Sequence, residues 1–307
     1  MKALVTGGAG FIGSNLVRHL LDRGDDVRVL DNFSTGNRRN LEGVDVEIVE
    51  GELRSYERVH NAVRGVEVVF HLGALGSVPR SVQDPLTSSA VNVEGTLNVL
   101  LAARDEGIRR VVFSSSSSVY GSKRDLPVTE SLPSDPISPY GVAKLAAERY
   151  CVSFSRVYES FETVVLRYFN VFGPRQSPFS QYAAVIPLFI TTIAAGAPIQ
   201  VDGDGEQRRD FTYVSNVVDA TVKAAEAAGA NGRIFNVAAG SPASVNAVAD
   251  SIGRILGKPP ERTFAPPRPG DIRDSWADVS AAKEILGYEP SVDLEEGLRR
   301  TIEHLGV

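Results

Sequence analysis

The chain of 307 residues is 43% hydrophobic and 23% charged, which is ordinary for a globular protein and enough for one large domain or two smaller ones. Its net charge is −6, no basic run is dense, and no stretch approaches the roughly 20 apolar residues of a membrane span, so we expect no nucleic-acid or membrane partner. Cys151 is the single cysteine and the four histidines lack metal-ligand spacing, so we expect a cytoplasmic protein with neither disulfides nor a metal site.

The first predicted element is a glycine-rich turn between a strand and a helix. Residues 2–5 are a short apolar run, and residues 11–23 carry apolar side chains at helical spacing. Between them Gly7, Gly10 and Gly13 let the backbone turn sharply and let a pyrophosphate approach the helix N-terminus. Asp31 follows a second strand, residues 26–30, where a carboxylate accepts both ribose hydroxyls and repels a 2′-phosphate. The pattern therefore predicts NAD rather than NADP, the alternative being a tight turn without a ligand.

Strands and helices then alternate along the chain. Further strands are predicted at residues 44–49, 66–72 and 110–113, with helices ending near residue 63 and running from residue 84 to residue 106. Residues 75–81 read as a loop. This alternation predicts an α/β fold with a doubly wound parallel sheet, whose ligands bind at the carboxyl ends of the strands.

A row of hydroxyls and a tyrosine–lysine pair follow. Residues 114–118 are all serine; their composition is that of a linker, but their place after a buried strand favours the ligand crevice. Pro139 is a good first residue for a helix that puts Tyr140 and Lys144 on one face. A surface pair is the alternative. Lowering the tyrosine pKa by roughly 3 takes about 4 kcal/mol, which Lys144 and a positive nicotinamide ring could supply together.

Together these motifs resemble the extended short-chain dehydrogenase/reductase family, and within it the NAD-dependent nucleotide-sugar epimerases. The resemblance spans essentially the whole chain and includes residues 168–175, 182–187, 202–211 and 268–271. It implies a Rossmann NAD-binding domain of residues 1–169 plus 214–243. It also implies a smaller, discontinuous α/β lobe of residues 170–213 plus 244–307 that binds the nucleotide sugar.

The resemblance also implies the residues of the site. Ser116, Tyr140 and Lys144 would be catalytic. The implied NAD contacts are Gly7, Gly10, Phe11, Ile12, Gly13, Asp31, Asn32, Ser34, Thr35, Gly36, Leu53, Leu72, Ala74, Ser114, Tyr140, Lys144 and Tyr168. The implied substrate contacts are Ser77, Ser116, Ser117, Tyr140, Asn170, Val185, Val201, Arg209, Arg268, Asp271 and Ser275.

The implied reaction inverts C4 of a UDP-hexose through a 4-keto intermediate. Tyr140 would take the proton of the 4-hydroxyl while C4 passes hydride to NAD⁺, and hydride would return to the other face. Ser275, aligned with a position beside the sugar C2, is small enough to imply that UDP-N-acetylglucosamine enters as well as UDP-glucose and UDP-galactose. Helices near residues 86–106 and 139–157 imply a homodimer.

Other activities of the same family stay open. A UDP-glucuronate 4-epimerase or decarboxylase is one alternative, and a nucleotide-sugar 4,6-dehydratase is another. Dehydratases of the family carry an Asp-Glu pair where Ser117 and Ser118 stand here, which argues against the second. A non-catalytic NAD-binding regulator is the least favoured, because both Tyr140 and Lys144 are present.

Overall fold

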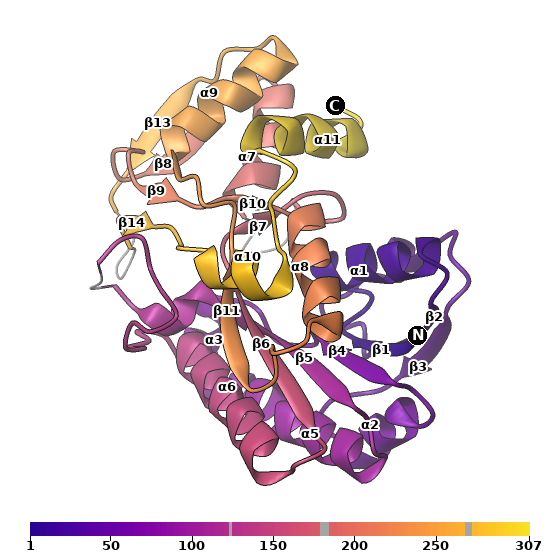
Figure 1. Ribbon diagram of the computed structural model, residues 1–307. Coiled ribbons are helices and arrows are strands. Elements are labelled where there is room, and N and C mark those ends of the chain that lie inside the picture. The colour runs from indigo at the N-terminus through magenta and orange to yellow at the C-terminus, as the bar shows by residue number, and fades with distance from the viewer. Residues whose placement is uncertain (123–124, 179–183, 268–271) are drawn as a thin grey trace.

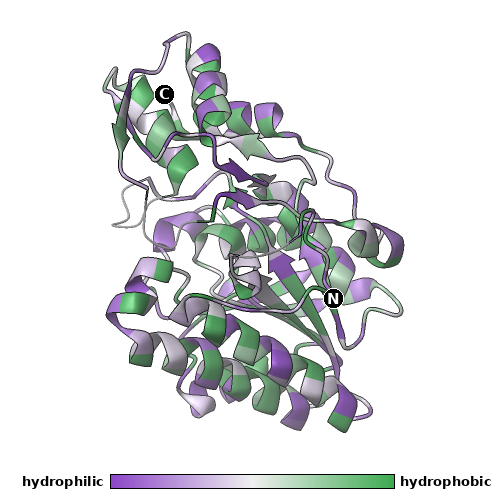
Figure 2. Ribbon diagram, turned by 90° about the vertical axis from the view of Figure 1, so that its left-hand side faces the viewer, coloured by the Kyte–Doolittle hydropathy of each residue, from purple (hydrophilic) through white to green (hydrophobic). Residues whose placement is uncertain are grey.

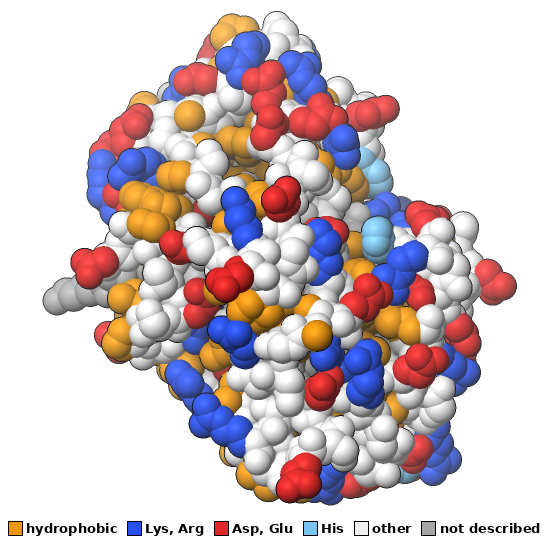
Figure 3. Space-filling view, in the orientation of Figure 1, with side chains coloured by type: hydrophobic (Ala, Val, Ile, Leu, Met, Phe, Trp, Pro, Cys, Tyr) orange, Lys and Arg blue, Asp and Glu red, His pale blue; other side chains and the backbone are white. Residues whose placement is uncertain are grey.

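The computed structural model describes residues 1–122, 125–178, 184–267 and 272–307, and it forms a larger lobe with a central sheet and a smaller lobe above it (Figure 1). Figure 2 shows the two lobes from the side, with apolar residues along the central strands. In the part of the chain described, no helix is both long and apolar enough to cross a membrane. On the face seen in Figure 3, acidic and basic side chains are interspersed.

Seven parallel strands form the central sheet, in the order β11-β6-β5-β4-β1-β2-β3. Their bounds are β1 Lys2–Thr6, β2 Asp26–Asp31, β3 Glu47–Glu50, β4 Val68–His71, β5 Arg110–Ser116, β6 Glu162–Tyr168 and β11 Arg233–Val237. The inner strands β1, β4, β5 and β6 are almost wholly buried, because helices cover both faces of the sheet, whereas the edge strand β3 is largely exposed. The predicted α/β fold with a doubly wound parallel sheet is confirmed, and β11 rejoins the sheet beside β6 as the resemblance implied.

Helices pack on each face of this sheet. α1 (Phe11–Asp22), α8 (Val214–Glu226) and α10 (Ser280–Leu286) lie on one face, and α2 (Tyr56–Val63), α5 (Gly95–Asp105) and α6 (Pro139–Val157) lie on the other (Figure 1). Two apolar clusters, one for each face, hold these layers together. Because helices cover both faces, a ligand can reach the central sheet only at the ends of its strands.

Two predicted segments differ from the structure. The helix α3 (Val78–Gln83) begins inside the predicted loop of residues 75–81, because Ser77 accepts a hydrogen bond from the backbone N–H of Arg80 and so caps the helix. The predicted helix of residues 84–106 is α4 (Pro85–Ser89), a π-helical segment (Ala90–Glu94) and α5. In that segment Asn92 bonds both backbone groups of Leu75, and π segments of this kind recur at functional sites.

In the part of the chain that the structure describes, the smaller lobe consists of short sheets and three helices. β8 (Ile199–Asp202) pairs with β13 (Arg262–Ala265), and β9 (Arg208–Arg209) lies between β12 (Ala243–Ser244) and β14 (Asp274–Ser275). α7 (Val185–Ala194), α9 (Val245–Leu256) and α11 (Leu294–Leu305) complete the lobe, and β7 (Val171–Phe172) pairs with β10 (Thr212–Tyr213) below it. α10, which the predicted division gives to the smaller lobe, packs on β11 and α8. The division into two sets of residue ranges stays a prediction.

Candidate active site

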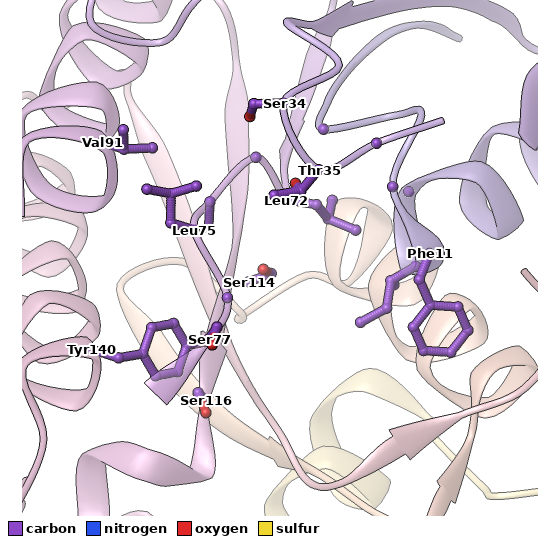
Figure 4. Close-up of a pocket in the computed structure, with 18 of the residues that line it drawn as sticks. Phe11, Ser34, Thr35, Leu72, Leu75, Ser77, Val91, Ser114, Ser116 and Tyr140 are labelled. Carbon is purple, nitrogen blue, oxygen red and sulfur yellow. The ribbon is translucent and has the colours of Figure 1, made fainter. Parts of the chain in front are cut away.

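A cavity of about 1010 Å³ opens at the carboxyl ends of β1, β2, β4 and β5 (Figure 4). Every residue predicted to contact NAD lines it, and so do five of the predicted substrate residues: Ser77, Ser116, Ser117, Tyr140 and Asn170. These residues come from segments far apart in the sequence, so the fold brings them together as the strand-end argument predicts. Their individual roles stay predictions.

The glycine turn leaves no room for side chains. A Cβ on Gly13 would lie 2.1 Å from the backbone oxygen of Gly7, and a Cβ on Gly7 would lie 2.7 Å from the backbone of Gly73. Gly7 also has a φ of +69°, which other residues rarely adopt. Among the described residues no side chain caps α1, whose first residues, Phe11 and Ile12, line the cavity. Such an uncapped helix N-terminus suits the pyrophosphate of a dinucleotide.

Asp31 is placed to hold a ribose. Its Oδ2 accepts a hydrogen bond from the backbone N–H of Ala9 at 2.9 Å, and its Oδ1 accepts one from the N–H of Phe33 at 2.8 Å. These bonds fix the carboxylate at the end of β2, and each oxygen has a second lone pair for a ribose hydroxyl. The site therefore fits NAD, which Gly7, Gly13 and Asp31 would hold.

Tyr140, Ser116 and Ser77 lie together at one end of the cavity, while Ser34 and Thr35 lie toward the other (Figure 4). Ser138 caps α6 through the N–H of Gly141 at 3.1 Å, and the buried hydroxyl of Ser81 accepts a hydrogen bond from the N–H of Tyr140 at 3.0 Å. The first turn of α6 is thus held by side chains on both sides, which fixes the direction in which Tyr140 leaves the helix.

Burial dominates the electrostatics of Tyr140 and Lys144. Burial raises the pKa of Tyr140, and a hydrogen bond with Ser116 lowers it in part. Lys144 donates from Nζ to the backbone oxygen of Ser114 at 2.8 Å, and burial lowers its pKa to about 8. Within the chain, desolvation therefore outweighs the effect of Ser116, and the lowering of the tyrosine pKa by Lys144 and a nicotinamide ring together stays a prediction. A positive nicotinamide ring beside the phenol would oppose that desolvation.

A buried ion pair lies next to the residues that are predicted to be catalytic. Glu148 and Arg167 are 0% and 1% exposed, and two hydrogen bonds of 2.9 and 2.7 Å join them. Ser115 donates to the same carboxylate at 2.5 Å. β5, β6 and α6 are therefore locked together next to Ser116.

His71 forms a second buried chain of hydrogen bonds. Its Nδ1 lies 2.7 Å from Oγ1 of Thr6 and its Nε2 lies 3.0 Å from Oγ1 of Thr96. Thr96 donates its own proton to the backbone oxygen of Asn92, so the imidazole must carry its proton on Nε2. Burial, and secondarily the charge of Lys144, lower the pKa of His71 to about 3. The histidine is therefore a neutral link beside the cofactor loop.

Part of the cavity wall was not predicted from the sequence. Arg80, Gln83, Thr87 and Val91 line the cavity, and they belong to α3, α4 and the π-helical segment, where a loop and a regular helix were predicted. Gln176 also lines it. The sequence Ser77-x-Pro79 could have predicted α3, because a serine followed by an early proline is typical of a helix N-terminus.

The remaining predicted substrate residues lie in or beside the smaller lobe. Among the described residues, the cavity wall does not include Val185, Val201, Arg209 or Ser275. Arg209 and Ser275 are register partners in β9 and β14, Val201 is buried in β8, and Val185 is the first residue of α7. Arg268 and Asp271 lie outside the described residues. The predicted substrate contacts thus lie partly in the cavity at the carboxyl ends of the strands and partly in the smaller lobe.

Comparison with known proteins decides the family. The family model described as "NAD dependent epimerase/dehydratase family" matches residues 3–238. This chain belongs to that family. The match confirms the predicted cofactor, NAD, and the predicted membership of the extended short-chain dehydrogenase/reductase group.

The chain is similar to several members of this family over nearly its full length. It is 41% identical to a UDP-glucose 4-epimerase of Mycolicibacterium smegmatis, with 99% of this chain and 98% of the relative covered. A crystal structure of UDP-glucose 4-epimerase with UDP-glucose from Thermotoga maritima has a TM-score of 0.95 at 39% identity, covering 100% and 99% of the two chains. A UDP-N-acetylglucosamine 4-epimerase from Methanobrevibacter ruminantium M1, in complex with UDP-N-acetylmuramic acid, has a TM-score of 0.94 at 39% identity, covering 99% and 97%.

Proposed function

We propose that this chain is an NAD-dependent epimerase that inverts C4 of a UDP-hexose. One observation supports this proposal most strongly. Tyr140 and Ser116 line the same cavity as Asp31 and the glycine turn, which are placed to bind a dinucleotide. The relatives named UDP-glucose 4-epimerase support the same reaction. When held by Gly7, Gly13 and Asp31, NAD⁺ would supply the acceptor for the C4 hydride and the donor for its return to the opposite face of the sugar.

The residues of this chain would manage the proton and the orientation. Tyr140 takes the proton from the sugar 4-hydroxyl and later returns it, and Ser116 holds the same oxygen by a hydrogen bond. Lys144 places a positive charge near the phenol and anchors the nicotinamide ribose. Asn170 and Arg209 bind the UDP group, so that binding energy remote from C4 holds the reacting carbon in place.

We further propose that both plain and N-acetylated UDP-sugars are substrates. Ser275 is a small residue at the position that the resemblance places beside the sugar C2, and its exposed fraction is 4%. A similar protein named UDP-N-acetylglucosamine 4-epimerase supports this breadth.

We also propose that the chain forms a homodimer through α3, α4 and α6 and works in the cytoplasm. Val82, Leu86, Val142 and Val157 on these helices are 64%, 83%, 53% and 65% exposed. Exposed apolar side chains on adjacent helices are typical of a contact surface. Cys151 is a free, buried thiol, which agrees with a reducing compartment.

The test is to incubate the purified protein separately with UDP-glucose, UDP-N-acetylglucosamine and UDP-glucuronate and to identify the products and the bound cofactor. We expect UDP-galactose and UDP-N-acetylgalactosamine from the first two sugars. Conversion of UDP-glucuronate alone would instead establish the alternative activity.

A further inference from the structure

Asp210 is a fully buried carboxylate in the segment that joins β9 to β10. Its Oδ1 accepts a hydrogen bond from the backbone N–H of Ala239 at 2.9 Å. Its Oδ2 accepts two, from the N–H of Gly240 at 3.1 Å and from that of Ala277 at 3.3 Å. Among the described residues no Lys, Arg or His forms an ion pair with it. The charge is thus held by backbone donors, and such charge-assisted hydrogen bonds are stronger than neutral ones.

These donors belong to the segments in which the chain passes between the lobes. Asp210 follows β9 and leads into β10 and α8. Ala239 and Gly240 follow β11 on the way to β12, and Ala277 follows β14 on the way to α10. One carboxylate therefore joins three separate crossings of the chain between the larger and the smaller lobe.

The backbone of Asp210 reaches the predicted substrate residues. Its N–H donates to the backbone oxygen of Ser275 at 2.9 Å, and its own oxygen accepts from Nδ2 of Asn170 at 3.3 Å. Asn170 has a φ of +33°, a conformation that needs support from its surroundings. Arg209 is the preceding residue and donates from Nη1 to the backbone oxygen of Arg273 at 2.9 Å. Three predicted substrate contacts thus depend on the position of one residue.

We propose that Asp210 is a positioning residue that holds the smaller lobe over the cavity, so that Asn170, Arg209 and Ser275 keep the UDP-sugar in register with Tyr140. This inference rests on the proposed function, because it concerns how the same substrate is held. Asp210 is not among the described residues that line the cavity, so the proposed role is to position other residues.

The test is Asp210→Asn, which keeps the shape of the side chain. Its amide can offer one acceptor oxygen, but its NH₂ group would face a backbone N–H that now finds a carboxylate oxygen. We expect the Kd for UDP and the KM for UDP-glucose each to rise at least about 10-fold. The affinity for NAD should stay within about 2-fold and kcat within about 3-fold of the wild-type values. The reason is that the glycine turn, Asp31 and Tyr140 form no hydrogen bond with Asp210 among the described residues. If Asp210 had only a structural role, the substitution would lower the yield of folded protein, and the folded fraction would keep the KM and the kcat of the wild type.

Asp274→Asn is the matched control. Asp274 lies on β14 beside Ser275, but its carboxylate is partly exposed and pairs with Arg208 at 3.1 Å. The same chemical change there should alter UDP affinity by less than about 2-fold, since exposed ion pairs contribute little.

If Asp210→Asn does not fold, amide hydrogen exchange on the wild type replaces it. Bound UDP should then slow exchange at Ala239, Gly240 and Ala277 together, while exchange in β2 stays unchanged. A folded Asp210→Asn protein that binds UDP with the wild-type Kd would overturn the inference. So would bound UDP that fails to slow exchange at all three amides together. Wild-type protein that binds UDP without converting a UDP-sugar would overturn only the proposed function, and failure to bind UDP would overturn both.

Discussion

Ser115 donates a 2.5 Å hydrogen bond from Oγ to Oε1 of Glu148, which ties the end of β5 to α6 one helical turn beyond Lys144. Arg167 completes the arrangement from β6 with two bonds to the same carboxylate. The strand that carries Ser116 and the helix that carries Tyr140 are therefore fixed to each other by a buried charge pair.

Replacing one member of this pair should destabilise the fold strongly. Glu148→Gln leaves the guanidinium of Arg167 buried without its counter-charge, so the free energy of unfolding should fall by about 3 to 5 kcal/mol. Chemical denaturation measures this value. The control is Glu50→Gln, which removes an exposed partner of Arg38 and should cost less than about 1 kcal/mol. Equal losses in the two variants would contradict this interpretation of the pair.

Acid should destabilise the protein through His71. Its pKa is about 3 in the folded chain against 6.5 when unfolded, so the unfolded state binds more protons between these values. The stabilisation is complete above pH 6.5 and is lost as the pH falls toward 3. From pH 7 to pH 5 the free energy of unfolding should drop by about 2 kcal/mol from this group alone.

The measurement compares unfolding of the wild type and His71→Asn at both pH values. The variant should be less stable at pH 7 and show a pH dependence smaller by that amount. An unchanged slope in His71→Asn would show that His71 is not a buried neutral group.

Asp31 should decide which dinucleotide binds. The carboxylate is fixed by the N–H groups of Ala9 and Phe33, so a 2′-phosphate could not displace it without breaking those bonds. Wild-type protein should bind NAD at least about 100-fold more tightly than NADP, a difference of about 2.7 kcal/mol. Asp31→Ser should reduce that ratio to below about 10, as measured by equilibrium dialysis. A ratio that survives the substitution would place the selectivity elsewhere.

Ser275 should control the size of the sugar. Ser275→Tyr puts a bulky ring at a buried position next to Arg209, so turnover of UDP-N-acetylglucosamine should fall at least about 10-fold while turnover of UDP-glucose stays within about 3-fold. Ser275→Ala is the control and should leave both rates near the wild type. Undiminished turnover of the N-acetylated sugar by the tyrosine variant would refute a gate at this position.

Local patterns predicted the cofactor end of the site, and tertiary hydrogen bonds explain what the patterns missed. The glycine turn, Asp31 and the helix that begins at Pro139 are each specified by a few neighbouring residues. The π-helical segment depends on Asn92 bonding Leu75, which no helical periodicity reveals. Likewise, the donors to Asp210 lie 29, 30 and 67 residues away in the chain, so only the fold shows that this carboxylate joins three crossings.

The most direct test of the central claim is Tyr140→Phe, which removes only the phenol oxygen. The variant is loaded with NAD, its cofactor content is verified, and conversion of UDP-glucose to UDP-galactose is measured beside the wild type. We predict that NAD binding stays within about 2-fold while kcat falls at least about 100-fold, because the phenol oxygen is the group proposed to take the proton of the 4-hydroxyl. Conversion at the wild-type rate by the NAD-loaded variant would contradict the account.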